Sequence, residues 1–134
     1  MKKVLVLMMS LFLTNNAFSA TSDYSEVVQA GKFLYISSQL PMDPTTGQIV
    51  QGDMITLTNL VIDHIQSQLQ LKGFKLSQVI KTEVYLTDVR DFQLMDSAYR
   101  TRFNFISPPT RDIVVAANLL NNSPIQISCV AYKN

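Results

Sequence analysis

Residues 107–115 (SPPTRDIVV) are the segment that most restricts what this chain can fold into. Pro108 and Pro109 fix φ and lack a backbone donor, so they predict an extended lead-in that ends any helix before it. The apolar residues 113–117 that follow predict a buried strand. Arg111 therefore lies at the start of a strand, where a guanidinium is suited to bind a carboxylate through two parallel hydrogen bonds. Taken alone, such an arginine is more often a surface charge or half of an ion pair.

Residues 1–20 have the layout of a secretory signal peptide. Two lysines precede an apolar run over residues 4–13, and residues 14–20 are polar, then small. The apolar run is too short to span a bilayer, so it indicates a cleaved export signal. We expect cleavage after Ser19 or Ala20 and a periplasmic or secreted protein that has no membrane contact once the signal is removed. A cytosolic protein with an apolar start is the alternative.

Residues 21–134 are enough for one modest core and a single domain. Two of the 11 basic residues of the chain lie in the signal segment, so 9 basic residues face 10 acidic ones and the net charge of the domain is near −1. A near-neutral domain without a basic run argues against a nucleic-acid partner. Cys129 is the single cysteine and lies in an apolar run, so we expect a buried side chain and no internal disulfide.

The hydrophobic pattern of residues 21–134 predicts an α+β domain. Alternating apolar runs predict strands, and apolar residues at three- and four-residue steps predict two amphipathic helices. In chain order we expect a hairpin, a loop, a helix, a strand, a second helix and two further strands. The strands of the hairpin cover residues 23–30 and 32–37 and are separated by Gly31. The later segments cover residues 41–47, 53–73, Val79–Leu86, 91–103, 111–117 and 124–132. The expected architecture is one mixed sheet packed on one layer of helices.

The first helix carries its own start and stop signals. Asp53 is a suitable N-cap and Gly73 fits the C′ position after the last turn. The apolar stripe between them consists of Met54, Leu57, Leu60, Val61, Ile65 and Leu69. His64 falls just off this stripe and is the single histidine, with no second ligand at metal spacing, so we expect no metal site.

The strand Val79–Leu86 has two different faces. Alternation places Ile80, Thr82, Val84 and Leu86 on one face and Val79, Lys81, Glu83 and Tyr85 on the other. The second face is charged yet half apolar, which fits solvated surface or a subunit interface. In the last strand, Gln126, Ser128 and Val130 share one face. Because one layer of helices covers one sheet face, we expect a closed oligomer to bury the other.

Four stretches taken together resemble the RidA/YjgF family of reactive intermediate deaminases. They are SSQLPMDPTTGQIV at residues 37–50, VIKTEVYLTDVRDF at residues 79–92, PPTRDIVV at residues 108–115 and IQISCVAY at Ile125–Tyr132. The resemblance covers residues 24–132. It implies a chorismate-mutase-like fold and a homotrimer with a central barrel and clefts between subunits. It also implies hydrolysis of 2-imino or enamino acids to 2-keto acids and ammonia, without a cofactor.

The resemblance also implies site residues. Arg111 matches the family arginine that binds the substrate carboxylate, and Tyr24 matches the tyrosine that lines the cleft. Backbone groups near Arg111, as at Ile113, and the loop around Ser37 would complete the substrate-binding pocket. A protonated imine is already electrophilic, so it needs mainly positioning and an attacking water.

Four positions depart from the family pattern. Gln126 replaces the glutamate that handles the water, and an amide orients a water but does not take its proton at neutral pH. Asp96 replaces an asparagine, Ile113 a cysteine or threonine, and Ser38 a glycine. Gln126 and Asp96 are therefore the candidate catalytic residues, as orienters of the attacking water. Asp96 could instead pair with Arg111 and block it.

These departures leave two main hypotheses. The first is a deaminase in which Arg111 holds the carboxylate while Gln126 or Asp96 orients water. The second is a protein of the same fold that binds a small carboxylate without turnover, which the replacement by Gln126 favours. A holdase-like role is a third alternative.

Overall fold

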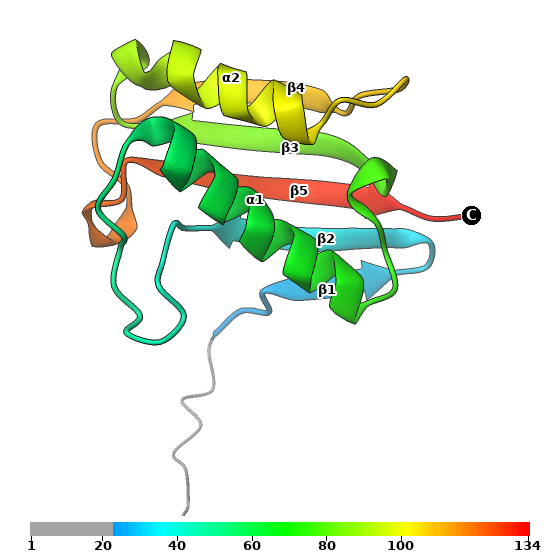
Figure 1. Cartoon of the computed structure of the whole chain (residues 1–134). Coiled ribbons are helices and arrows are strands. Elements are labelled where there is room, and N and C mark those ends of the chain that lie inside the picture. The colour runs from blue at the N-terminus through cyan, green and yellow to red at the C-terminus, as the bar shows by residue number, and fades with distance from the viewer. Residues whose placement is uncertain (1–22) are drawn as a thin grey trace, which may run out of the picture.

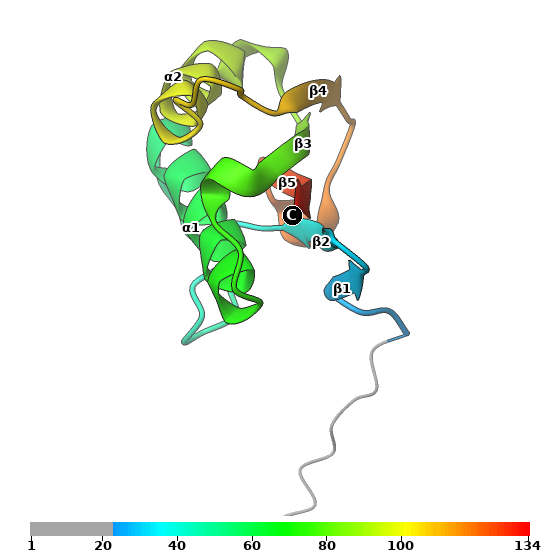
Figure 2. The same cartoon turned by 90° about the vertical axis from the view of Figure 1, so that its right-hand side faces the viewer.

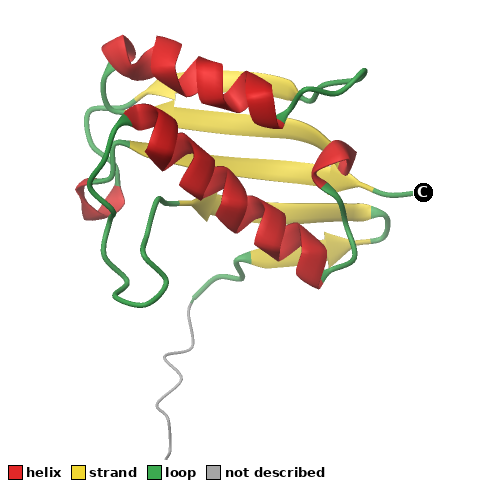
Figure 3. Ribbon diagram, viewed as in Figure 1, coloured by secondary structure: helices red, strands yellow, loops and turns green. Residues whose placement is uncertain are grey.

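The computed structural model of the chain describes residues 23–134 (Figure 1). The predicted signal peptide and its cleavage site lie outside these residues. The helices and strands are β1 (Val27–Ala30), β2 (Phe33–Gln39), α1 (Met54–Leu71), β3 (Val79–Leu86), α2 (Phe92–Arg102), β4 (Thr110–Val115) and β5 (Ile125–Tyr132). Both helices pack on the same side of one sheet, which confirms the predicted α+β architecture (Figures 2 and 3). Within residues 23–134, no helix is long and apolar enough to cross a membrane.

The sheet is mixed, with strand order β1-β2-β5-β3-β4. Its neighbouring strands are antiparallel except β3 and β4, which are parallel. Parallel neighbours need a long crossover, and α2 provides it. This connection brings the proline-rich segment back along α2 and starts β4 beside that helix (Figure 1).

The predicted turn and cap residues of the first half of the chain are confirmed. Gly31 has a φ of 59° between β1 and β2, a conformation that glycine adopts without strain. The Asp53 side chain accepts a hydrogen bond from the Thr56 backbone N–H at 2.9 Å and so caps α1. Gly73 follows the last turn of α1 with a φ of 75°. These local signals fix where α1 begins and ends.

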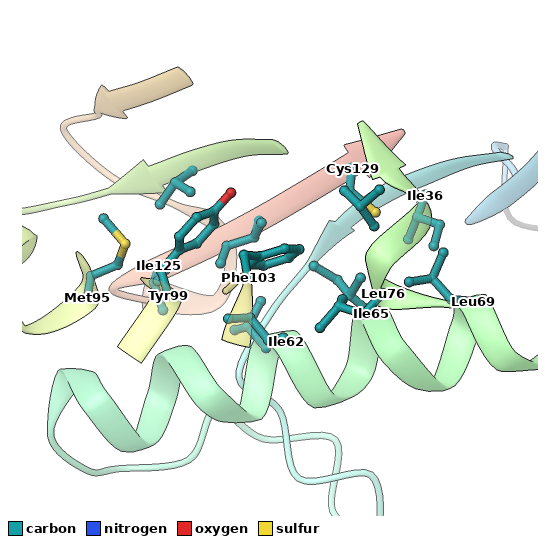
Figure 4. Close-up of a cluster of buried hydrophobic side chains, with 14 of the residues drawn as sticks. Ile36, Ile62, Ile65, Leu69, Leu76, Met95, Tyr99, Phe103, Ile125 and Cys129 are labelled. Atoms are coloured by element: carbon teal, nitrogen blue, oxygen red, sulfur yellow. The ribbon is translucent and has the colours of Figure 1, made fainter. Parts of the chain in front are cut away.

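The core lies between the sheet and the two helices (Figure 4). The stripe of α1 is buried as predicted except at Leu60, which is partly buried, and the rings of Tyr99 and Phe103 stack with their centroids 4.5 Å apart. Cys129 is buried in this core, and burial raises the pKa of its thiol to about 12. The thiol is therefore un-ionised at neutral pH and acts as a small apolar side chain.

The structure corrects the predicted faces of the strand Val79–Leu86 at its first two residues. Val79 is buried, whereas Ile80 is exposed. The register with β5 shifts between Val79 and Lys81, so one extra residue is accommodated there. Such an irregularity reverses the inward and outward alternation locally, which a period of two read from sequence does not reveal.

The structure also corrects the prediction that residues 113–117 form a buried strand. β4 is an edge strand of the sheet, and Val114 and Val115 are 43% and 49% exposed. The helix layer covers one face of β4, and within the described part of the chain no strand pairs with its outer edge. The apolar composition of β4 therefore reflects a surface left open in the single chain.

Candidate active site

Arg111 lies on the helix-facing side of the sheet. It is in parallel register with Thr82, whose side chain is buried beneath the helices. The guanidinium carbon lies 4.6 Å from the centroid of the Tyr99 ring and 5.8 Å from that of the Phe92 ring. Both distances are within the range of a cation–π contact. The Arg111 side chain is 21% exposed, so the cation is held on aromatic rings with one part open to solvent.

Asp96 on α2 holds the same guanidinium. Arg111 Nη1 donates to Asp96 Oδ1 at 2.7 Å, and Arg100 Nε donates to Asp96 Oδ2 at 2.9 Å. The sequence left open whether Asp96 would pair with Arg111, and the structure shows the pair. Among residues 23–134, Asp96 is the one carboxylate that pairs with Arg111, and it does so through a single nitrogen. Other N–H groups of the guanidinium remain for a ligand.

The charge of Asp96 is set by opposing effects. Burial by itself raises the pKa of Asp96, but hydrogen bonds from Arg111 and then Arg100 leave the pKa below its ordinary value. Asp96 is therefore ionised at neutral pH and is a weak proton acceptor. This favours a role in positioning charge over a role as the base that activates water.

Tyr99 lies against the Arg111 guanidinium and supports the Asp96–Arg111 pair. Its hydroxyl lies 2.6 Å from Thr82 Oγ1, and burial raises the pKa of Tyr99, so the phenol stays neutral. We did not predict Tyr99 or Arg100 as site residues from the sequence, because Tyr99 falls on the apolar stripe of the second helix, at three- and four-residue steps with Phe92, Met95 and Phe103. The i, i+4 spacing of Asp96 and Arg100 was the available signal.

Ile113 lies on the same side of β4 as Arg111. It is in register with Val84, packs against the core and is partly buried. A branched aliphatic side chain here gives the site an apolar wall without adding a polar group.

Gln126 lies on the opposite face of the sheet from Arg111. It alternates with the buried residues Ile125 and Ile127 of β5, and its Nε2 donates to Ser38 Oγ at 3.1 Å. Within one chain, the two residues are therefore separated by the sheet.

Tyr24 and Ser37 lie together, in a different part of the domain from Arg111 and Asp96. With Ser38 and His64 they line a groove between the start of the domain and the loop that follows β2. His64 Nε2 lies 2.8 Å from the Met42 backbone oxygen and attaches this loop to α1. The predicted residues thus form two groups in a single chain: Asp96, Arg111 and Ile113 beside α2, and Tyr24, Ser37 and Gln126 near β2.

Comparisons with known proteins agree with this fold. A profile of the family described as endoribonuclease L-PSP matches residues 14–133. A RutC family protein of Pyrococcus horikoshii is 39% identical over 126 residues, which cover 94% of this chain and 99% of the relative. Mouse 2-iminobutanoate/2-iminopropanoate deaminase is 32% identical over 118 residues, covering 88% and 87%. The crystal structure of RidA from an Antarctic Psychrobacter species matches with a TM-score of 0.78 and 29% identity, covering 85% of this chain and 91% of the RidA chain.

Proposed function

The chain belongs to the endoribonuclease L-PSP family, which includes RidA, and on that premise we propose that it hydrolyses reactive 2-imino or enamino acids to 2-keto acids and ammonia. The mouse relative is named for this kind of activity. The proposed substrate is a small imino acid with one carboxylate.

The observation that carries the proposal is the placement of Arg111. Its guanidinium is fixed by the Tyr99 ring and by Asp96, so little side-chain freedom is left to lose when a carboxylate binds. A planar fork of donors on a rigid support recognises a carboxylate in a defined orientation. Orientation is the main requirement of a substrate that is already electrophilic.

In the proposed reaction, water adds to the carbon of the protonated imine and loses a proton. The nitrogen then gains a proton, the carbon–nitrogen bond breaks, and ammonia leaves while the hydroxyl loses its proton and the carbonyl forms. Gln126 would orient the water through its amide, and Asp96, which is a weak proton acceptor, would hold Arg111. Solvent or a second water accepts the proton.

We further propose that Arg111 and Gln126 act together only across a boundary between subunits of a homotrimer. The sheet separates them within one chain, and the face that carries Gln126 is the face left uncovered by the helices. Exposed Val28, Tyr35 and Val114 add apolar surface to that face or its edge. Covering it with neighbouring copies would remove this surface from water.

An exported location of this enzyme is also a proposal, and it rests on residues 1–20. Export would place the deaminase away from cytosolic sources of imines, so it would act on imines formed or released outside the cytosol. Fractionation of cells that express the full chain tests this point, and protein retained in the cytosol at its full length would contradict it.

A second candidate function is binding of a small carboxylate without turnover. Gln126 stands where the family has a carboxylate base, and its amide already donates a hydrogen bond to Ser38. Both features favour binding without hydrolysis. In this case Arg111 retains its role and the hydrolytic step is absent.

One assay separates the two functions. An amino acid oxidase generates imines in the presence of semicarbazide, and the purified protein competes with semicarbazide for them. We expect wild type to reduce the trapped imine, Arg111→Ala to lose this effect and the distant surface variant Arg90→Ala to keep it. A wild type without effect, together with activity in Gln126→Glu, would reject the deaminase and support the binding protein.

A further inference from the structure

Asp96 lies between two arginines that differ greatly in exposure. Arg111 binds one carboxylate oxygen and is 21% exposed, whereas Arg100 binds the other and is 76% exposed. Asp96 itself is 16% exposed. The carboxylate is therefore a partly buried anion with one fixed cation and one cation at the surface.

The two arginines are not held equally. Arg111 is held by the aromatic rings of Tyr99 and Phe92 as well as by Asp96. Within the described residues, the contact of Arg100 that fixes its guanidinium is the single N–H···O bond to Asp96. Exposed ion pairs of this kind contribute little net free energy, so a competing cation can replace Arg100 at little cost.

We propose that Asp96 and Arg111 together form a zwitterion-binding pair, in which the nitrogen cation of the ligand replaces Arg100 on Asp96 Oδ2. The inference rests on the proposed function only in that Arg111 holds the carboxylate of the ligand. The ligand class is then an α-iminium or α-ammonium carboxylate, not a simple carboxylate.

The charges of the pair match those of such a ligand. Asp96 and Arg111 are in direct contact at 2.7 Å, so they present adjacent charges of opposite sign. An α-amino or α-imino acid carries its cation and its carboxylate on neighbouring carbon atoms, also with no net charge. Each ligand charge then lies against the opposite protein charge, which strengthens binding in a partly desolvated site.

The same pair discriminates between substrate and product. A 2-keto acid retains the carboxylate but has no cation to place on Asp96, and its negative charge lies close to the Asp96 carboxylate. Like charges at this distance are unfavourable. The pair thereby favours the imino acid over the keto acid that forms from it, and it promotes release of the product.

The surface beside the pair restricts the rest of the ligand. A groove runs along Arg100 and Arg111 and is walled by Tyr99, Phe103, Pro108 and Pro109. Apart from the two guanidinium groups and the amide of Asn104, these walls are aromatic or aliphatic. A small apolar side chain fits them, whereas a second carboxylate would find no further cation on these walls.

The experiment measures binding by calorimetry and uses two probes of similar size, L-alanine and pyruvate. Both probes carry the carboxylate, but only L-alanine carries the cation. The difference between their affinities therefore reports the contribution of the cation. The proteins are wild type, the isosteric variant Asp96→Asn, the surface variant Arg100→Gln and the control Arg90→Gln. We expect wild type to bind L-alanine about tenfold more tightly than pyruvate.

The variants then separate the roles of the two residues. Asp96→Asn should remove the preference or reverse it, because pyruvate is no longer repelled. Arg100→Gln should tighten L-alanine binding, because its competitor on Asp96 is gone, and Arg90→Gln should match wild type. Equal binding of the two probes by wild type, binding of neither probe, or an Asp96→Asn variant that retains the preference would each overturn the inference.

Binding is measured without turnover, so the two proposals fail separately. A wild type that prefers L-alanine but hydrolyses no imine would reject the deaminase and leave the zwitterion pair in place. A wild type that hydrolyses imines but shows no preference between the probes would do the reverse.

Discussion

Two aspartate–arginine pairs of the same chemistry differ in almost every physical respect. Asp88 accepts four hydrogen bonds from Arg90, three of them from the guanidinium of an arginine that is 87% exposed. These bonds lower the pKa of Asp88 to about 2. The Asp96–Arg111 pair has one such bond, and burial opposes the ionisation of Asp96.

The number of hydrogen bonds in a pair therefore does not identify the candidate binding site. Arg90 binds a neighbour two residues away, and its guanidinium is otherwise solvated. Arg111 binds across α2 and β4 and lies on two aromatic rings. An arginine held by packing in a fixed direction can orient a ligand, whereas an arginine in solvent reorganises at little cost.

The largest expected difference between the pairs follows from removing each arginine. Arg111→Ala leaves Asp96 partly buried with Arg100 alone, and we expect a loss of about 2–3 kcal/mol in the free energy of unfolding. Imine hydrolysis should fall roughly a hundredfold or more, because the substrate is no longer oriented. Urea unfolding and the semicarbazide assay measure the two effects. An Arg111→Ala variant with wild-type hydrolysis would contradict the role of this pair.

A smaller effect tests what supports Arg111. Tyr99→Phe removes the hydroxyl that pairs with Thr82 but keeps the ring under the guanidinium. We expect a loss of about 1 kcal/mol in unfolding free energy, with carboxylate affinity close to wild type. Urea unfolding measures the loss of stability, and calorimetry measures the carboxylate affinity separately. Tyr99→Leu, which also removes the ring, should weaken binding, and equal binding by both variants would show that the ring does not hold Arg111.

Acid titration sharpens the comparison further. The pKa of Asp96 is lowered in the folded protein, so its contribution to stability is fully present above the ordinary value of 3.8 and is lost as pH falls through the folded-state value. Asp96→Asn lacks this contribution at all pH values. We expect the stability difference between wild type and Asp96→Asn to shrink as pH is lowered below 3.8, as measured by urea unfolding. A difference independent of pH would contradict the charged pair.

The smallest effect is expected at the exposed pair. Arg90→Ala should change the unfolding free energy only slightly, because a solvated pair gains little. Added salt should reduce even this difference, since it screens exposed charges. Urea unfolding at low and high salt measures it. A loss as large as that of Arg111→Ala would remove the distinction between the two pairs.

The fold was largely predictable because its signals are local. The Asp53 cap, the stripe of α1 and the turn at Gly31 are set by neighbouring residues, and the structure confirms each. The position of Arg111 at a strand start was predicted in the same way, from two prolines and an apolar run. The bulge beside Val79 was missed, because it depends on pairing with a distant strand.

The site was less predictable. Whether Asp96 would contact Arg111 depends on how α2 lies across β4, and the two residues are fifteen positions apart in the chain. The separation of Gln126 from Arg111 depends on which sheet face each strand position occupies. The exposure of β4 depends on its place at the edge of the sheet.

The sequence by itself determined the elements, their order and the residue types available for chemistry, because capping, periodicity and turn formation act over a few residues. The tertiary structure alone decided which charges meet and how deeply they are buried. Burial and the distance between charges arise from the packing of segments that are remote in sequence, and these quantities turn one of two similar aspartate–arginine pairs into a candidate binding site.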